Sequence, residues 1–245
     1  MESMGYTEHG RRHAGVVARR ARSIMEALGH PARSCELAAI AAYLHDIGNI
    51  ANRDHHAQSG AILAHSLLHE AGMNIEETIE VVTAIGHHHE TDGAPVSDVA
   101  AAVILADKSD VHRSRVRDKA MIDLDIHDRV NYSVTRSALR VVGPHAAREM
   151  TGERGGNGDP SGNPGSGNGP RNATEVADTA QVRISDVDAG EEEGTEITLV
   201  LRIDTSISPV MEYFEIFLPR MLLSNRAADK LGATYRLVIN ETHLL

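Results

Sequence analysis

The residues best suited to chemistry lie at the end of an Ala-rich apolar helix, in the run Tyr43-Leu-His-Asp-Ile-Gly48. An adjacent imidazole and carboxylate suit a borderline-hard transition metal such as iron, manganese or zinc. A buried carboxylate without a partner is costly, and a metal ion is one of the few groups that offset this cost. The pair His45-Asp46 therefore predicts a metal site close to the protein interior.

Two further candidate ligands lie far from this pair in the sequence. His13 precedes it, in the first helix that the pattern predicts. Asp107 follows the apolar run Val103-Ile-Leu-Ala106, which places it in the same setting as Asp46. Both residues are expected to face the pair.

Histidine doublets between these positions complete the candidate set. Small residues follow His56, which allows close helix packing and favours His56 over His55 as the inward residue. The apolar stripe before residues 87–90 favours His88, with His89 as a third-metal ligand or a group behind the ligands. The predicted ligands are therefore His13, His45, Asp46, His56, His88 and Asp107, and Asp46 is also the predicted catalytic residue.

Two other histidine groups are interpreted as bystanders. His65 and His69 are one helical turn apart, but the H-E-x-x-H pattern of a metalloprotease is absent, so a solvated face is expected. His127-Asp128 is a second His-Asp pair, but no Ala-rich helix precedes it and it follows all the other ligands.

Basic residues gather beside the candidate ligands of this acidic chain. Lys108 directly follows Asp107, Arg113 and Arg117 follow soon after, and Arg12 adjoins His13. Lysine and guanidinium groups pair well with phosphate, so this cluster predicts an anionic substrate. Lys108, Arg113, Arg117 and Arg12 are the predicted substrate-binding residues, and Lys108 is also a predicted catalytic residue. The alternative is a solvated helix end that complements the helix dipole.

Composition restricts the other function classes. The 245 residues include 41% hydrophobic residues and carry a formal net charge of −11, so no stable nucleic-acid partner is expected. The single cysteine, Cys35, fits a reducing compartment. The first residues are polar, and no apolar stretch reaches about 18 residues, so we expect a cytoplasmic protein without a secretory signal or membrane partner.

Apolar periodicity predicts a mainly α fold. The expected helices span residues 5–28, 32–50, 54–70, 75–90, 97–105 and 127–139, which together form a helical domain over residues 1–150.

Composition changes after this domain. Residues 151–174 are rich in Gly, Pro and Asn and predict a disordered linker, with a long ordered loop as the alternative. Residues 175–245 predict a small α+β domain, with strands at 181–185, 196–203 and 234–240 and a helix at 209–231. A unit of this size buries a sheet poorly, so it should pack on the helical domain or on a second copy, which makes a homodimer the expected assembly.

The motif Tyr43-Leu-His-Asp-Ile-Gly48, with His13 before it and Asp107 after it, resembles the HD-domain superfamily of metal-dependent phosphohydrolases over residues 7–117. His56 and His88 resemble the additional ligands of its two-metal members. The runs at 56–60 and 88–90 are also similar to HD-GYP cyclic-di-GMP phosphodiesterases, but residues 91–95 lack the Gly-Tyr-Pro signature. The chain as a whole resembles uncharacterised bacterial HD proteins.

This resemblance implies two divalent transition metals, iron or manganese first, with magnesium, zinc, nickel or cobalt as alternatives. The first metal would be held by His13, His45, Asp46 and Asp107, and the second by Asp46, His56 and His88. A hydroxide between two such metals could cleave a phosphomonoester or phosphodiester, with a nucleotide as the expected small substrate. Two alternatives stay open: a di-iron oxygenase of the same superfamily, and a non-catalytic regulatory protein that senses a nucleotide or metal.

Overall fold

The computed structural model describes residues 10–116, 119–143, 146–151 and 194–244. Five helices come first: α1 (Arg11–Ala27), α2 (Ala32–Leu44), α3 (His56–Glu70), α4 (Ile75–Gly86) and α5 (Asp98–Lys108), with a 3-10 turn, η2 (Ile47–Ile50), between α2 and α3. Short 3-10 turns η3 (Arg113–Arg115) and η4 (Lys119–Met121) lead to α6 (Ile126–Ser133). Among the described residues, no helix is both long and apolar enough to cross a membrane.

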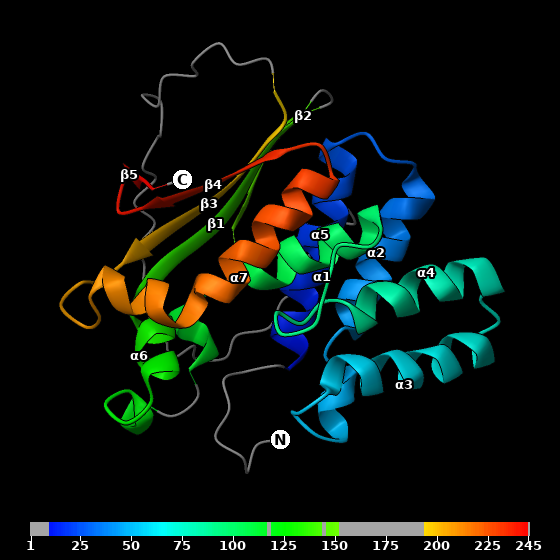
Figure 1. The fold of residues 1–245 in the computed structure, drawn as a ribbon, viewed down its shortest axis with the longest axis horizontal. Helices are drawn as coiled ribbons and strands as arrows, with labels where there is room; N and C mark the ends of the chain where they lie inside the picture. The colour runs from blue at the N-terminus through cyan, green and yellow to red at the C-terminus, as the bar shows by residue number, and fades with distance from the viewer. Residues whose placement is uncertain (1–9, 117–118, 144–145, 152–193, 245) are drawn as a thin grey trace, which may run out of the picture. The chain divides into compact units, whose positions relative to one another are not determined.

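A five-stranded sheet follows, in the order β2-β1-β3-β4-β5. Its strands are β1 (Val134–Gly143), β2 (Ala146–Thr151), β3 (Glu196–Ile203), β4 (Thr234–Ile239) and β5 (Thr242–His243). The β3–β4 pair is parallel and the other pairs are antiparallel. Parallel neighbours need a crossover, which here is helix α7 (Val210–Lys230). Figure 1 shows α7 running along the sheet with α5 beside it.

The buried apolar side chains form one cluster that includes both helices and strands. The middle of α5 is buried on every side, from Val99 to Lys108, so α5 is a central helix of the fold. The cluster continues through Leu139 of β1 and Leu199 of β3 to Phe217 of α7. The described residues therefore form one compact unit, in which α7 packs against the helices as well as the sheet.

The prediction of a mainly helical protein with a small sheet in its C-terminal region is confirmed. The predicted sixth helix is wrong beyond Ser133, because Val134 to Gly143 form strand β1 and pair with β3, which lies more than 50 residues later in the sequence. Such a distant partner is invisible to a local pattern. Since β1 and β3 share a sheet, the predicted boundary at residue 150 does not separate two packed bodies among the described residues.

Several helix ends also differ from the predicted ones. α2 ends at Leu44 and α4 at Gly86, whereas the apolar pattern extended them to residues 50 and 90. The segment predicted as a linker (151–174) and the strand predicted at 181–185 lie outside the described residues, apart from Thr151 at the end of β2. The predicted strand at 196–203 and the helix at 209–231 correspond to β3 and α7.

Candidate metal centre

The six predicted ligands lie at or near the ends of five helices. His13 is in the first turn of α1, His45 and Asp46 directly follow α2, His56 begins α3, His88 follows α4, and Asp107 is in the last turn of α5. Five of the six residues are at most 8% exposed, and the side chain of Asp46 is 10% exposed. We call these six residues the ligand cluster: His13, His45, Asp46, His56, His88 and Asp107.

One part of the cluster has four donor atoms grouped around a common point. His13 Nε2 lies 3.3 Å from His45 Nε2 and 3.3 Å from Asp107 Oδ1. His45 Nε2 lies 3.4 Å from Asp46 Oδ2 and 3.6 Å from Asp107 Oδ1. Donors bound about 2.0–2.2 Å from one ion lie about 2.8–3.6 Å apart when they are neighbours in tetrahedral or octahedral geometry. These four separations therefore fit donors to a divalent metal.

The other part of the cluster is joined to the first through Asp46. His56 Nε2 lies 3.4 Å from Asp46 Oδ1 and 3.1 Å from His88 Nε2. The two oxygens of Asp46 thus face different histidines, as a carboxylate that bridges two ions would. In two overlapping sets, His13-His45-Asp107 and His45-Asp46-His88, all donor atoms lie within 4.8 Å of one another.

The orientation of the histidines is the strongest sign of metal binding. Three of them donate Nδ1–H to the carbonyl three residues earlier: His45 to Ala42, His56 to Arg53 and His88 to Ile85, at 2.7–2.8 Å. The carbonyls of Ala42 and Ile85 lie in the last turns of α2 and α4, where a helix leaves carbonyls without an internal partner. In a neutral ring this contact assigns the proton to Nδ1 and leaves a lone pair on Nε2.

Two such lone pairs face each other between His56 and His88, at 3.1 Å. Neither nitrogen can then donate to the other, and a cation between them would turn this repulsion into two coordinate bonds. His13 is oriented in a related way, with Nδ1 at 2.7 Å from Asp110 Oδ2. A carboxylate that orients a metal-binding histidine is a common feature of metal sites.

Charge within the cluster also suits a cation. Burial would raise the pKa of Asp107, but Lys108, His13 and His45 together hold it well below its usual range. Burial, with a contribution from His45 and Lys108, lowers the pKa of His88 far enough to keep its ring neutral. Burial would also lower the pKa of His45, but Asp46 and Asp107 raise it to about 10 in the metal-free protein.

Gly48 permits the close approach that brings His56 to Asp46. A Cβ at Gly48 would overlap the carbonyl oxygen of His56 and approach the amide of Gly60. Only a residue without a side chain lets the start of α3 lie directly against η2. The glycine at the end of the His-Asp motif therefore has a packing role in holding the two parts of the cluster together.

A small pocket lies over the cluster. Its walls include charged residues that belong to several elements, and its free volume is about 10 Å³, room for roughly one water-sized group. The lining residues are Asp46, Arg53, His56, His88, His89, Asp107, Lys108, Arg115 and Arg220. Lys108 Nζ lies 2.7 Å from both Asp107 Oδ2 and Glu90 Oε2, so two carboxylates already compensate its charge.

The predicted cationic residues have different positions. Lys108 lines the pocket. Arg12 does not line it, and its Nη2 lies 3.3 Å from Asp110 Oδ2. Arg113 does not line it either, since its guanidinium lies over the ring of Tyr132, 5.3 Å from the ring centre. Arg117 lies outside the described residues, and the predicted roles of all four stay predictions.

The other histidines that the sequence analysis considered lie at different distances from the pocket. His89 lines the pocket and its ring centre is 5.0 Å from that of His56. His65 and His69 stack on the surface of α3, and neither lines the pocket. The side chain of His127 is exposed and lies beside Asp125.

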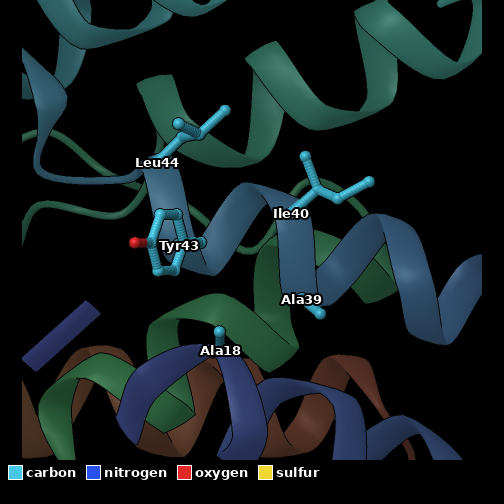
Figure 2. A pocket seen from close by; sticks show the side chains of 5 residues that line it. All are labelled: Ala18, Ala39, Ile40, Tyr43 and Leu44. Atoms are coloured by element: carbon cyan, nitrogen blue, oxygen red, sulfur yellow. The ribbon is translucent and has the colours of Figure 1, made fainter. Parts of the chain in front are cut away.

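A larger pocket of about 360 Å³ lies between α1 and α2, away from these charged groups. Figure 2 shows its walls, Ala18, Ala39, Ile40, Tyr43 and Leu44. The Tyr43 hydroxyl is the one polar side-chain group among these residues, so the pocket offers no ligand set for a metal or a phosphate.

Sequence reasoning missed three residues that complete the centre: Asp110, Glu90 and Arg220. Asp110 lies one turn after Asp107, and Glu90 follows the histidines at 87–89, so nearby acids were a usable signal for both. Arg220 belongs to α7, and its Nε lies 3.2 Å from Glu90 Oε1. A contact across 130 residues leaves no local signal.

Comparison with known proteins agrees with this geometry. Residues 11–112 match the family model of the HD domain, which supports the resemblance of this part of the chain to the HD-domain superfamily. Uncharacterised protein MJ1020 of Methanocaldococcus jannaschii is 31% identical over 136 residues, which are 46% of this chain and 52% of the relative. The chain thus spans about half the length of this relative. No solved structure matches the chain.

HD domains are generally hydrolases that bind divalent metals, and the matched residues include all six members of the ligand cluster. The His and Asp side chains gathered here could hold a metal.

Proposed function

We propose that this protein is a metal-dependent phosphohydrolase that cleaves a phosphomonoester or phosphodiester of a small molecule, with nucleotides as the first substrate class to test. The observation that carries the proposal is the convergence of Nε2 atoms and carboxylate oxygens in the ligand cluster, with each histidine held from behind through Nδ1. The match to the family model of the HD domain supports the same chemistry.

In this proposal His13, His45, Asp46 and Asp107 would hold one divalent metal, and Asp46, His56 and His88 the other. Iron and manganese suit this mixture of imidazole and carboxylate. Two such metals would supply Lewis acidity at the phosphoryl oxygens and lower the pKa of a bound water towards neutrality.

The protein's own groups would orient the histidine ligands and compensate the charge of the carboxylates. Asp110 would fix the ring of His13, and the carbonyls of residues 42, 53 and 85 would fix the other three histidines. Lys108 would keep Asp107 ionised and stay close to the phosphate of the substrate, because it lies between Asp107 and Glu90 at the pocket wall. The narrow pocket would admit a phosphate at its mouth and exclude bulk water below it.

The test is turnover by the manganese-loaded and iron-loaded full chain. We expect hydrolysis of an aryl phosphate or of a member of a nucleotide panel, with loss of turnover after chelation and recovery when metal is restored. Oxygen consumption together with a mixed-valent di-iron signal would instead make the protein an oxygenase. Tight nucleotide binding without turnover would make it a sensor.

A further inference from the structure

Helix α7 supplies one wall residue of the pocket, although it lies outside the residues that match the HD domain. The match covers residues 11–112, and α7 spans Val210–Lys230. Arg220 of this helix lines the same pocket as Asp46 and His88. The pocket therefore combines the ligand cluster with a cation from the C-terminal part of the chain.

The guanidinium of Arg220 is held on two sides. Its Nε lies 3.2 Å from Glu90 Oε1, and its central carbon lies 4.6 Å from the centre of the Phe217 ring, one turn earlier on α7. Phe217 is buried, whereas the Arg220 side chain is 19% exposed. The packing leaves little conformational freedom to lose when a ligand binds.

The two outer nitrogens of Arg220 have capacity to bind a further group. Among the described residues, Nε has the one polar contact of this guanidinium, so Nη1 and Nη2 have no partner there. By contrast, Lys108 lies between two carboxylates, and Arg115 is buried and donates from Nη1 to the Asp110 carbonyl at 2.7 Å. Arg220 is thus a pocket cation with a pair of donors to spare.

We propose that Arg220 is a substrate-positioning residue, which binds an anionic phosphate oxygen at the mouth of the metal centre through Nη1 and Nη2. Two parallel N–H donors match two oxygens of a phosphate, and a lysine ammonium cannot reproduce this geometry. The inference deepens the proposed function and rests on it for the identity of the reaction. Anion binding can be measured separately, without turnover.

The experiment compares Arg220→Gln and Arg220→Lys with Arg226→Gln, which removes an exposed charge from the same helix and leaves the pocket lining intact. Each full chain is loaded with manganese, its metal content and melting temperature are measured, and it is titrated with inorganic phosphate by calorimetry. We expect Arg220→Gln to weaken phosphate binding about tenfold or more. Arg226→Gln should stay within about twofold of wild type, and metal content should be equal in all variants.

Arg220→Lys keeps the positive charge and can still reach Glu90. This variant therefore keeps the test valid if Arg220→Gln fails to fold. We expect it to weaken phosphate binding by several-fold, because the paired donors are lost. With an aryl phosphate substrate, both Arg220 variants should raise KM more than they lower kcat. A purely structural role would instead lower the melting temperature and leave KM unchanged.

The outcomes separate this inference from the proposed function. Phosphate binding that depends on Arg220, in a protein that hydrolyses nothing, would support the inference and overturn the proposed function. If wild type hydrolyses its substrate but both Arg220 variants keep the phosphate affinity and KM of wild type, the proposed function is supported. The inference on Arg220 is then overturned. Equal weakening in the Arg226 control would also overturn the inference, because the effect would then be one of general charge.

Discussion

The ligand cluster and the cations around it are held in different ways. Each cluster histidine is at most 3% exposed and is fixed through Nδ1, three by a backbone carbonyl three residues earlier and His13 by the Asp110 carboxylate. Arg53 and Arg220 are 27% and 19% exposed as side chains and reach the pocket from separate elements. The candidate metal ligands are therefore buried and fixed in place, whereas the pocket cations are longer side chains that stay partly exposed.

The ligand cluster and the surrounding cations should therefore control different properties, metal binding and substrate affinity. A metal site tolerates little displacement, because its donors must lie within a few tenths of an ångström of the required positions. A phosphate-binding arginine at the pocket mouth holds no metal in this proposal, so its loss should affect substrate affinity in a graded way. Changes in the cluster should therefore abolish metal binding, and changes at the mouth should raise KM with metal content intact.

The largest effect should come from Asp46→Ala. This change removes the carboxylate whose two oxygens face the two parts of the cluster. We expect loss of both metals and no measurable turnover, with metal content determined by elemental analysis of the purified protein. Asp123→Ala, at an exposed acid, and His127→Ala, at the second His-Asp pair, should both retain the metal content of wild type. Two metals in Asp46→Ala would refute a bridging role.

Gly48→Ala should separate the two parts of the cluster. The added methyl group would overlap the His56 carbonyl oxygen, so α3 must move away from η2 and take His56 with it. We expect metal content to fall from about two ions per chain to about one, with about 1–3 kcal/mol lower stability from overpacking. Gly15→Ala in α1, where the new Cβ has only an ordinary contact, is the matched control. Two tightly bound metals in Gly48→Ala would show that His56 does not need this approach.

Asp110→Asn should have a smaller effect on the same site. Asn keeps the size of the side chain but weakens the charge-assisted bond to His13 Nδ1. Loss of such an orienting group typically lowers metal affinity by about 10–100-fold. Competition with a chelator of known affinity would measure the change, and a spectroscopic probe such as cobalt would report whether the coordination is altered. Wild-type affinity would mean that His13 is positioned by its helix alone.

The sequence could predict the cluster because its members carry local signals. His45-Asp46 and Asp107 each follow an apolar run, and this setting identifies them without knowledge of the fold. In the structure the Nε2 atoms of His13 and His45 each lie 3.3–3.7 Å from a carboxylate oxygen of Asp46 and of Asp107, as ligands of a shared metal would. Their roles as ligands stay predictions until metal is measured.

The sheet and the pocket mouth could be predicted only in part, for a physical reason. The alternating pattern at 196–203 identified β3, but β1 was interpreted as helix, because its strand character depends on pairing with distant residues. Arg220 was missed for the same reason, since its importance comes from a contact with Glu90 that the fold creates. Residues whose role depends on distant partners are not recognisable from local spacing.

The smallest expected effect is that of Arg12→Gln. This variant tests the prediction from sequence adjacency against the prediction from the position of Arg12 in the structure. Its position beside His13 in the sequence predicts a phosphate contact, but Arg12 pairs with Asp110 and does not line the pocket. We expect KM within about twofold of wild type and a stability loss below about 1 kcal/mol, as is usual for partly exposed ion pairs. KM and melting temperature would be measured beside those of Arg220→Gln. If Arg12→Gln raised KM as much as Arg220→Gln, adjacency in the sequence would be the better guide to the substrate, and the mouth of the site would extend to α1.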